Sequence, residues 1–342
     1  MFWLLKFLLV VLVLFVGIFI FRKIPALSNL VIKVHKFTAA EKASVKGKVI
    51  VVTGGTDGIG KVFVQEMYKN GAIVIFSGRS IEKAKDIFEG LSLNMKSSSD
   101  MIADVKDSLI FKRSEFSDLD EVQNFCDFVI DLVSQKNYGR IDHLFNNAGF
   151  YDFDYRQTKQ GFDSTFGVNF ISHVITTHRL LDLIKQSKDP RIVFTSSFVQ
   201  RYTTAEKCLQ PDNPKSISFS FYSYSKSKMA NAVIARVLSK MHPKILFFSF
   251  HPGVVHTGIM RNFPAWLRVI IPYLKFIIRA PYEGAQSMLK IAYSSRVDLL
   301  PINGCYFDDN GEVEKIQGEQ NWSQNWLQSI HEKVAINWKN FA

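Results

Sequence analysis

A run of β-branched residues at 49–53 leads directly into a glycine-rich turn and then into a helix-like pattern. A strand that is apolar throughout, rather than alternately apolar and polar, is typical of a parallel sheet covered on both faces. In the turn, Gly54, Gly58 and Gly60 let the backbone approach a pyrophosphate closely, and the following helix presents free N–H groups to it. This order of strand, turn and helix favours a phosphate-binding turn over the alternative, an ordinary tight turn.

Strand-like and helix-like patterns alternate through the rest of the chain, and such alternation predicts a parallel sheet with crossover helices. We expect an α/β fold with a Rossmann-type, doubly wound sheet of seven parallel strands and helices on both faces. The polar, serine-rich residues 92–107 indicate a surface loop. The expected strands are residues 48–53, 72–76, 109–112, 141–145, 191–195, 245–250 and 304–307, and the expected helices include 59–69, 119–135, 162–185 and 224–241.

The chain begins with an apolar segment. Residues 7–21 contain no polar side chain, and Lys6 can extend its ammonium group to a membrane surface. We expect residues 1–21 to form a single N-terminal transmembrane helix. A cleaved signal peptide is the alternative, but no small-residue cleavage site follows, and Arg22 and Lys23 stand where one would be expected. The positive-inside rule then places residues 22 onward on the cytoplasmic side of the membrane. The endoplasmic reticulum is the expected membrane, with the lipid droplet as the alternative.

The net charge of +11 is concentrated beside this segment, because residues 22–48 carry seven Lys or Arg side chains against one Glu. A basic cluster next to an apolar segment is attracted to anionic lipid headgroups, which explains the charge more simply than nucleic-acid binding does. We therefore interpret residues 22–45 as a basic juxtamembrane tether with membrane lipids as partners, and we expect no nucleic-acid partner.

Cysteine and histidine usage argues against a metal site. The 3 Cys are widely spaced and odd in number, so they encode neither a disulfide framework nor a zinc cluster. His173, His178, His251 and His256 show no ligand spacing and no carboxylate grouping. We expect no bound metal and a reducing compartment.

Further motifs follow the glycine-rich turn in chain order. Residues 146–149 read N-N-A-G, Ser197 ends the fifth strand, residues 224–231 read Y-S-K-S-K-M-A-N, and residues 252–257 read P-G-V-V-H-T. Together with the T-G-x-x-x-G-x-G spacing of the turn, these motifs resemble the short-chain dehydrogenase/reductase family. The resemblance implies an oxidoreductase domain, which we place at residues 46–315, with a nicotinamide cofactor.

Hydride transfer to a carbonyl leaves an alkoxide, and its protonation requires a general acid within hydrogen-bond reach. A tyrosine can act as this general acid near neutral pH only if a nearby cation stabilises the phenolate that it leaves. Lys228 follows Tyr224 by four residues, so both side chains project from the same face of a helix. The resemblance assigns this pair to catalysis, with Ser197 on the substrate oxygen and Asn169 holding a water.

Two rivals adjoin these positions. Tyr222 and Lys226 have the same four-residue spacing as the catalytic pair, and Ser196 precedes Ser197. Spacing alone does not separate the alternatives. The M-A-N sequence that follows Lys228 and the family's use of the second serine favour Tyr224 and Ser197.

The end of the second strand indicates the cofactor. It reads I-F-S-G-R, with no acid and with Arg79. An acid here usually binds the ribose 2′-OH of NAD, whereas an arginine accommodates the 2′-phosphate of NADP. We expect NADP(H), with a solvated Arg79 as the alternative; at Glu115 the chain departs from the family's usual Asp. The expected cofactor-binding residues are Gly54, Thr56, Asp57, Gly58, Ile59, Gly60, Arg79, Glu115, Asn147, Ala148, Gly149, Tyr224, Lys228, Pro252, Gly253, Val255 and Thr257.

Late motifs indicate a branch of the family. Residues 281–286 read P-Y-E-G-A-Q and residues 304–307 read G-C-Y-F, which resemble the retinol dehydrogenase-like branch. Residues 263–278, rich in Trp, Phe, Ile and Leu, are interpreted either as a lid over an apolar substrate that touches the bilayer or as a buried helix pair. Apolar side chains every four residues within 316–342 predict an amphipathic helix packed on the domain or on the membrane.

Together these features predict a membrane-anchored oxidoreductase that interconverts a lipophilic alcohol with its carbonyl compound and favours reduction. Retinoids, steroids and fatty aldehydes are the substrate candidates. The alternative is a catalytically idle NADP-binding scaffold or sensor on the membrane. A homodimer is left open.

Overall fold

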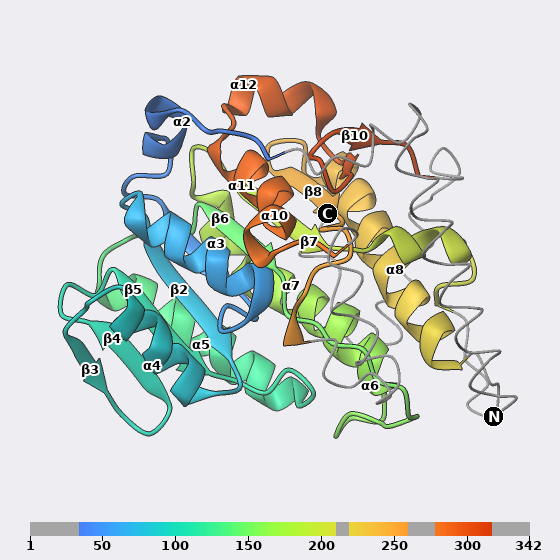
Figure 1. Ribbon diagram of the computed structural model, residues 1–342, viewed down its shortest axis with the longest axis horizontal. Helices are drawn as coiled ribbons and strands as arrows, with labels where there is room; N and C mark the ends of the chain where they lie inside the picture. The colour runs from blue at the N-terminus through green and yellow to red at the C-terminus, as the bar shows by residue number, and fades with distance from the viewer. Residues whose placement is uncertain (1–33, 210–218, 259–277, 317–342) are drawn as a thin grey trace, which may run out of the picture. The chain divides into compact units, whose positions relative to one another are not determined.

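The computed structural model describes residues 34–209, 219–258 and 278–316 (Figure 1). The chain divides into two compact units, residues 1–34 and 35–342, and the architecture below belongs to the second. The predicted anchor, the segment 263–277 and the helix predicted within 317–342 lie outside the described residues. Within the described residues, no helix is both long enough and apolar enough to cross a membrane.

A single sheet of ten strands runs through the described part of the chain, in the order β10-β9-β8-β7-β6-β1-β2-β5-β4-β3. Seven neighbouring strands are parallel, and they are the seven expected ones. The predicted Rossmann-type α/β architecture is therefore confirmed for the parallel part. These strands are β1 (Val49–Val52), β2 (Ile73–Gly78), β5 (Leu109–Arg113), β6 (His143–Asn146), β7 (Arg191–Thr195), β8 (Leu246–Phe250) and β9 (Tyr306–Phe307).

Antiparallel strands extend both edges of the sheet and correct the expectation of a purely parallel one. They are β3 (Met95–Ser97) and β4 (Met101–Asp104) at one edge and β10 (Val313–Glu314) at the other. The prediction of a surface loop at 92–107 is therefore wrong. Ile102 and Ala103 are buried in the sheet, and the Asp104 carboxylate accepts hydrogen bonds from the backbone N–H groups of Ser108 (2.6 Å) and Leu109 (2.8 Å).

Side chains of the central strands alternate between two apolar cores. Val49 and Val51 pack with one set of helices, while Ile50 and Val52 pack with the other. Each fully buried aliphatic side chain of this kind contributes about 1.5–3 kcal/mol, so both faces are held by apolar burial. One face carries α5 (Leu119–Gln135), α7 (Ser172–Lys185) and α8 (Phe219–Met241); the other carries α3 (Gly58–Lys69), α4 (Ile81–Gly90), α10 (Pro281–Gly284) and α11 (Gln286–Tyr293) (Figure 1).

The described end of the predicted tether contains a short helix, α2 (Ala39–Ala43). Thr38 and Glu41 form a capping box at its start, with the Thr38 N–H donating to Glu41 Oε2 at 2.7 Å. The Phe37 ring packs edge-on against Tyr293 of α11 at 4.9 Å, and the Ser44 hydroxyl donates to the Tyr293 carbonyl oxygen at 3.1 Å. The last residues before β1 are thus attached to the domain.

Candidate active site

The predicted site residues lie in the loops that follow the carboxyl ends of the parallel strands. The strand order reverses between β1 and β6, because β2 lies on one side of β1 and β6 on the other. In open α/β sheets, ligands bind outside the carboxyl ends of the strands at such a reversal. The fold therefore positions a ligand site where the glycine-rich turn leaves β1.

The glycine-rich turn is in close contact with two other motifs. Gly54 (φ +67°) and Gly58 (φ +53°) have left-handed backbone conformations, which favour glycine. A Cβ atom at Gly54 would lie 2.7 Å from Ala148 Cα, and one at Gly58 would lie 2.7 Å from Thr257 Cγ2. The turn, the N-N-A-G motif and the P-G-V-V-H-T motif are thus brought together, and the N-terminus of α3 opens beside them.

Hydrogen bonds from the N-N-A-G motif hold the glycine-rich turn. Asn147 Nδ2 donates to the carbonyl oxygens of Thr53 and Gly54, each at 3.1 Å. Thr53 Oγ1 accepts from the backbone N–H groups of Asn147 and Ala148, each at 2.9 Å. Thr53 is not among the predicted site residues, although it is the first residue of the T-G motif. Asn146, the first residue of this motif, donates to Thr177 Oγ1 at 2.9 Å.

The loop after β8 completes this side of the site. Gly253 has φ +77°, and a Cβ atom there would lie 2.7 Å from Arg279 Nε. A Cβ atom at Gly284 would lie 2.4 Å from Val255 Cγ2 and 2.9 Å from Ile59 Cγ2. The P-Y-E-G-A-Q motif therefore packs over the start of α3 and over the loop after β8. Pro252 and Thr257 are half-buried in this loop.

Ser197, Tyr224 and Lys228 are brought together at the carboxyl end of β7. Lys228 Nζ donates to the Thr195 carbonyl oxygen at 3.1 Å and lies 5.4 Å from the centroid of the Tyr224 ring. Burial raises the pKa of Tyr224 to about 12, against the opposing effect of a hydrogen bond with Ser197. Burial also lowers the pKa of Lys228 to about 7. Burial thus favours the neutral form of both groups, while Tyr224 keeps part of its surface exposed.

Asn169 lies in a π-helical turn, η2 (Gly167–Ile171). The helix expected over 162–185 is therefore interrupted: α6 (Ser164–Phe166) and η2 precede α7. Asn169 Oδ1 accepts from the Phe150 N–H at 2.9 Å, and Asn169 Nδ2 donates to the Phe150 carbonyl oxygen at 3.0 Å and to Ser227 Oγ at 3.1 Å. The Asn169 side chain thus connects the loop after β6 to α8, and π turns of this kind occur frequently at functional sites.

Asn231 links the site residues and was not among those predicted. Its Nδ2 donates to the carbonyl oxygens of Asn169 (2.9 Å) and Thr195 (3.0 Å). The Thr195 carbonyl oxygen therefore accepts from both Asn231 and Lys228. The signal was present in the sequence, because Asn231 ends the Y-S-K-S-K-M-A-N motif.

Ser196, the alternative to Ser197, bonds to the backbone of α8. Ser196 Oγ donates to the Lys228 carbonyl oxygen at 2.6 Å, so it holds the backbone of α8. The rival pair Tyr222 and Lys226 shows the same ring and ammonium arrangement, at 5.5 Å. The Ser197 hydrogen bond, however, goes to Tyr224.

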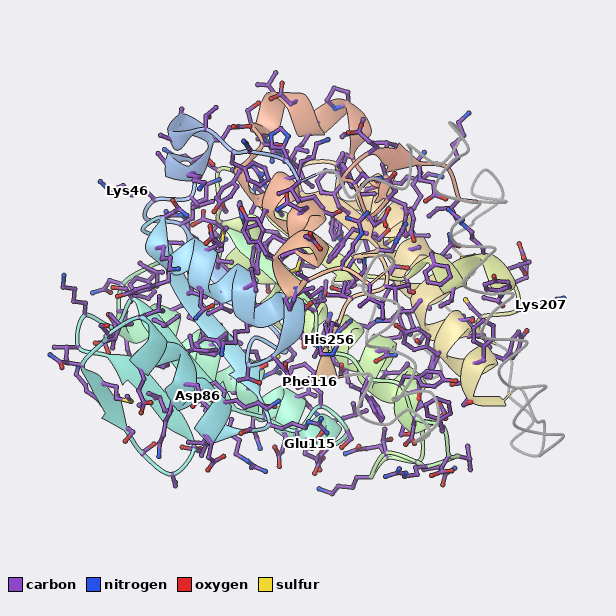
Figure 2. The ribbon with its side chains drawn as sticks, in the orientation of Figure 1. Lys46, Asp86, Glu115, Phe116, Lys207 and His256 are labelled. Carbon is purple, nitrogen blue, oxygen red and sulfur yellow. The ribbon has the colours of Figure 1, made fainter. Side chains whose placement is uncertain are left out.

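Arg79 and Glu115, both predicted to contact the cofactor, form an ion pair with each other. Arg79 Nε lies 3.9 Å from Glu115 Oε2, and the Arg79 side chain is 70% exposed. Figure 2 labels Glu115 and Phe116, which lie in the loop between β5 and α5. The guanidinium is thus at the surface, where it can contact a ligand, but a carboxylate lies beside it.

Asp57 and Thr56 shape the same region. The Asp57 carboxylate caps α3 by accepting from the Gly58 N–H at 2.7 Å, and it also forms an ion pair with Lys83. A Cβ atom at Gly78 would lie 2.4 Å from Thr56 Oγ1. The end of β2 therefore has no room for a side chain at Gly78 while Thr56 is in place.

An aromatic side chain packs on the Tyr224 ring, and further aromatic pairs involve neighbouring segments. The Tyr151 ring packs edge-to-face on the Tyr224 ring at 5.3 Å, and Phe153 packs on Tyr151 at 4.6 Å. Tyr151 Oη lies 3.1 Å from Ser220 Oγ. Tyr202 contacts the half-exposed Phe221 at 5.3 Å. Aromatic rings beside a catalytic tyrosine candidate suit an apolar substrate that carries a single polar end.

Comparison with known proteins identifies the family. A family model described as short chain dehydrogenase matches residues 48–268. The chain belongs to the short-chain dehydrogenase family of oxidoreductases, and within it to the retinol dehydrogenase-like branch. Retinol dehydrogenase 14 of Mus musculus is 30% identical over 274 residues, which cover 78% of this chain and 79% of the relative. Retinol dehydrogenase 12 of Bos taurus is 32% identical over 269 residues, 77% of this chain and 78% of the relative.

Solved structures show the same fold. A short chain dehydrogenase from Burkholderia cenocepacia in complex with NADP has a TM-score of 0.58 and 21% sequence identity, covering 78% of this chain and 98% of its own. A short chain dehydrogenase from Salmonella enterica has a TM-score of 0.59 and 20% identity, covering 80% and 99%. At these identities the similarity is one of fold.

Proposed function

We propose that this protein is a membrane-anchored, NADP(H)-dependent oxidoreductase that interconverts a lipophilic alcohol with its aldehyde or ketone, chiefly as a reductase. The observation that carries this proposal is the convergence of Ser197, Tyr224 and Lys228 beside the glycine-rich turn, with Asn169 joined to them through Asn231. These are the groups that proton transfer to a nascent alkoxide requires.

The residues around the glycine-rich turn suit a dinucleotide. The α3 N-terminus and the backbone of Gly54 and Gly58 would hold its pyrophosphate, and Arg79 would meet a 2′-phosphate. When bound, the nicotinamide supplies hydride chemistry. The fit rests on the position of the turn at the reversal of strand order.

The protein's own residues would handle the proton. In the reducing direction, the Ser197 and Tyr224 hydroxyls would hydrogen-bond the substrate oxygen, and Tyr224 would donate its proton to the alkoxide oxygen to give the alcohol. Lys228, once protonated, would stabilise the phenolate that remains. In oxidation the same proton moves back to Tyr224. The site thus pairs an acid of high pKa with a nearby lysine of low pKa.

The substrate proposal is supported by the aromatic surroundings of Tyr224 and by the names of the relatives. Retinoids are therefore the first candidate, with steroids and fatty aldehydes next. The test is to incubate detergent-solubilised full-length protein with NADPH and, separately, retinal, ketosteroids and long-chain aldehydes, and to measure NADPH oxidation. We expect turnover of at least one class. No turnover of any, with intact NADPH binding, would favour the idle scaffold instead.

The membrane proposal rests on the apolar residues 7–21 and the basic residues that follow them. We propose a single span with a cytoplasmic catalytic domain, in the endoplasmic reticulum or on lipid droplets. The full-length protein should stay with membranes through high-salt and carbonate washes, whereas a chain beginning at Thr38 should lose this tight association. Release of the full-length protein by carbonate would contradict a span.

A further inference from the structure

A pocket of about 460 Å³ lies at the end of the sheet where the parallel strands begin, whereas the candidate active site lies where they end. Pro190 and Ile245 line it, and they directly precede β7 and β8, so the pocket is at the amino ends of these strands. The catalytic residues follow the carboxyl ends. The pocket is therefore separate from the candidate dinucleotide site, and its volume is typical of small-molecule sites.

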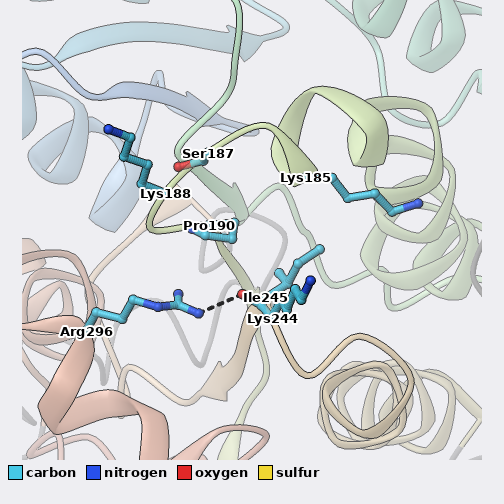
Figure 3. Close-up of a pocket in the computed structure, with 7 residues that line it drawn as sticks. All are labelled: Lys185, Ser187, Lys188, Pro190, Lys244, Ile245 and Arg296. Atoms are coloured by element: carbon cyan, nitrogen blue, oxygen red, sulfur yellow. Dashed lines mark hydrogen bonds between the residues drawn. The ribbon is translucent and has the colours of Figure 1, made fainter.

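Of the described residues that line the pocket, four are cations and none is an acid. Its charged residues are Lys185, Lys188, Lys244 and Arg296 (Figure 3). The presence of Lys185 is explained by the end of α7, because a cation is stabilised in the last turn of a helix. Its ammonium group also lies 3.4 Å from Asp182 Oδ1. Lys188 and Lys244 are exposed and form no ion pair with any residue in the described part of the chain.

Arg296 provides the strongest signal. Its Nη2 donates to the Lys244 carbonyl oxygen at 2.7 Å, as Figure 3 shows. Its Nη1 is buried and forms an ion pair with Asp189 Oδ1 at 3.6 Å, without a hydrogen bond to any residue in the described part of the chain. The Asp189 carboxylate already binds Lys48 at 2.7 Å and Arg191 at 2.5 Å. One carboxylate thus faces three cations, so its single negative charge does not neutralise the positive charge around it.

We propose that this pocket binds a phosphate-bearing ligand, with the phosphate against Arg296 and within reach of Lys188 and Lys244. A guanidinium matches the geometry of phosphate oxygens, and lysines add flexible point charges. In Figure 3 the ammonium groups of Lys185 and Lys188 point away from the middle of the pocket. Exposed lysine side chains reorient readily, so Lys188 would close on the anion as it binds.

The test uses detergent-solubilised full-length protein in excess NADPH, which keeps phosphate away from the candidate dinucleotide site. Inorganic phosphate and glycerol 3-phosphate are titrated by calorimetry. We expect saturable binding that Arg296→Gln weakens about tenfold or more, because it removes a charged hydrogen bond. A Lys188→Gln, Lys244→Gln double variant should weaken it as well. Lys136→Gln, at a distant surface ion pair, and Arg79→Ala should leave it unchanged.

The double variant guards against misfolding, because both lysines are exposed and unpaired in the described part of the chain. Glycerol 3-phosphate and phosphatidylcholine vesicles with or without phosphatidic acid distinguish the source of the phosphate. Variant-sensitive binding of glycerol 3-phosphate supports a soluble phosphate ester, and variant-sensitive binding of the phosphatidic acid vesicles alone supports a lipid headgroup. The proposal is overturned if no phosphate compound binds, if neither pocket variant weakens binding, or if Arg79→Ala abolishes it.

Discussion

Burial of Tyr224 and Lys228 moves the pKa of the tyrosine up and that of the lysine down. A tyrosine that holds its proton is ready to donate it, provided that a cation stabilises the product. The two side chains therefore have to be judged as a pair.

We predict that Tyr224→Phe lowers kcat by about 10²- to 10⁴-fold, because it removes only the proton donor. Cofactor affinity should change little. Tyr222→Phe is the matched control, since it removes the same atom two residues away, and it should leave kcat nearly unchanged. Steady-state NADPH oxidation measures both, and the reverse ranking would show that Tyr222 is the acid.

Arg79 should set cofactor preference. Its exposed guanidinium follows β2, and a charged hydrogen bond to the 2′-phosphate contributes about 1.5–3 kcal/mol. Arg79→Ala should therefore lower the ratio of NADPH to NADH affinity about ten- to a hundredfold in fluorescence titrations. An unchanged ratio would make Arg79 a surface charge, and would also remove the argument for reduction as the favoured direction.

Glu115 should have the opposite effect. Its carboxylate lies 3.9 Å from Arg79 Nε, so it competes with the 2′-phosphate for the guanidinium. The carboxylate also repels the negatively charged 2′-phosphate. Glu115→Gln should raise NADPH affinity and leave NADH affinity nearly constant in the same titrations. An equal rise in the affinities for NADPH and NADH would indicate that Glu115 acts on the adenine or the ribose, which both cofactors contain.

At the scale of the elements, α8 and the π turn depend on each other through Asn231. Asn231→Ala leaves the carbonyl oxygens of Asn169 and Thr195 without this donor. We predict that kcat falls about ten- to a hundredfold through misplacement of Lys228, while NADPH affinity is retained. Asn303→Ala is the control, because it also removes two partly buried hydrogen bonds, from the Phe247 N–H and to the Ile245 carbonyl oxygen, at the amino end of β8. Equal losses of kcat in both variants would indicate a purely structural role.

The elements also show what the sequence could predict. The parallel strands were recognisable because they bury short apolar runs, of which β1 from Val49 to Val52 is the most continuous. The hairpin of β3 and β4 was missed because its short strands depend on pairing with β5, a contact made only in the folded sheet. The π turn at Asn169 was missed because apolar spacing does not distinguish it from an α-helix.

In the candidate site, too, some features follow from local sequence motifs and others depend on contacts between distant segments. Local motifs predict Tyr224, Lys228 and Ser197 as site residues, and the structure brings these three side chains together. The ion pair between Arg79 and Glu115 was not foreseen, because it depends on β2 and β5 being neighbours. Contacts between segments distant in the chain carry no local pattern.

At the scale of the whole molecule, Asp189 joins the amino ends of β1 and β7. Burial acts to raise the pKa of Asp189, but hydrogen bonds from His143, Arg191 and Lys48 lower it below its ordinary value. An acid whose pKa is lower in the folded protein stabilises the fold above its unfolded pKa of about 3.9, and this contribution is lost as the pH falls further.

We therefore predict that Asp189→Asn lowers the free energy of unfolding by about 3 kcal/mol at neutral pH, because it leaves the basic partners without their carboxylate. The difference from the natural protein should shrink below about pH 4. Urea unfolding at several pH values measures it. Asp182→Asn, at an exposed pair with Lys185, should cost less than about 1 kcal/mol. A difference that does not depend on pH would contradict the ionic role of Asp189.

The crowding between Gly78 and Thr56 restricts how the chain could exchange one cofactor for another. A carboxylate at the end of β2 is the simplest change toward NADH, yet any side chain at Gly78 would collide with Thr56 Oγ1. Redesign would have to shorten Thr56, a residue of the glycine-rich turn, before an acid could be added at Gly78. An evolving sequence would meet the same barrier, so steric packing as well as charge constrains its nucleotide choice.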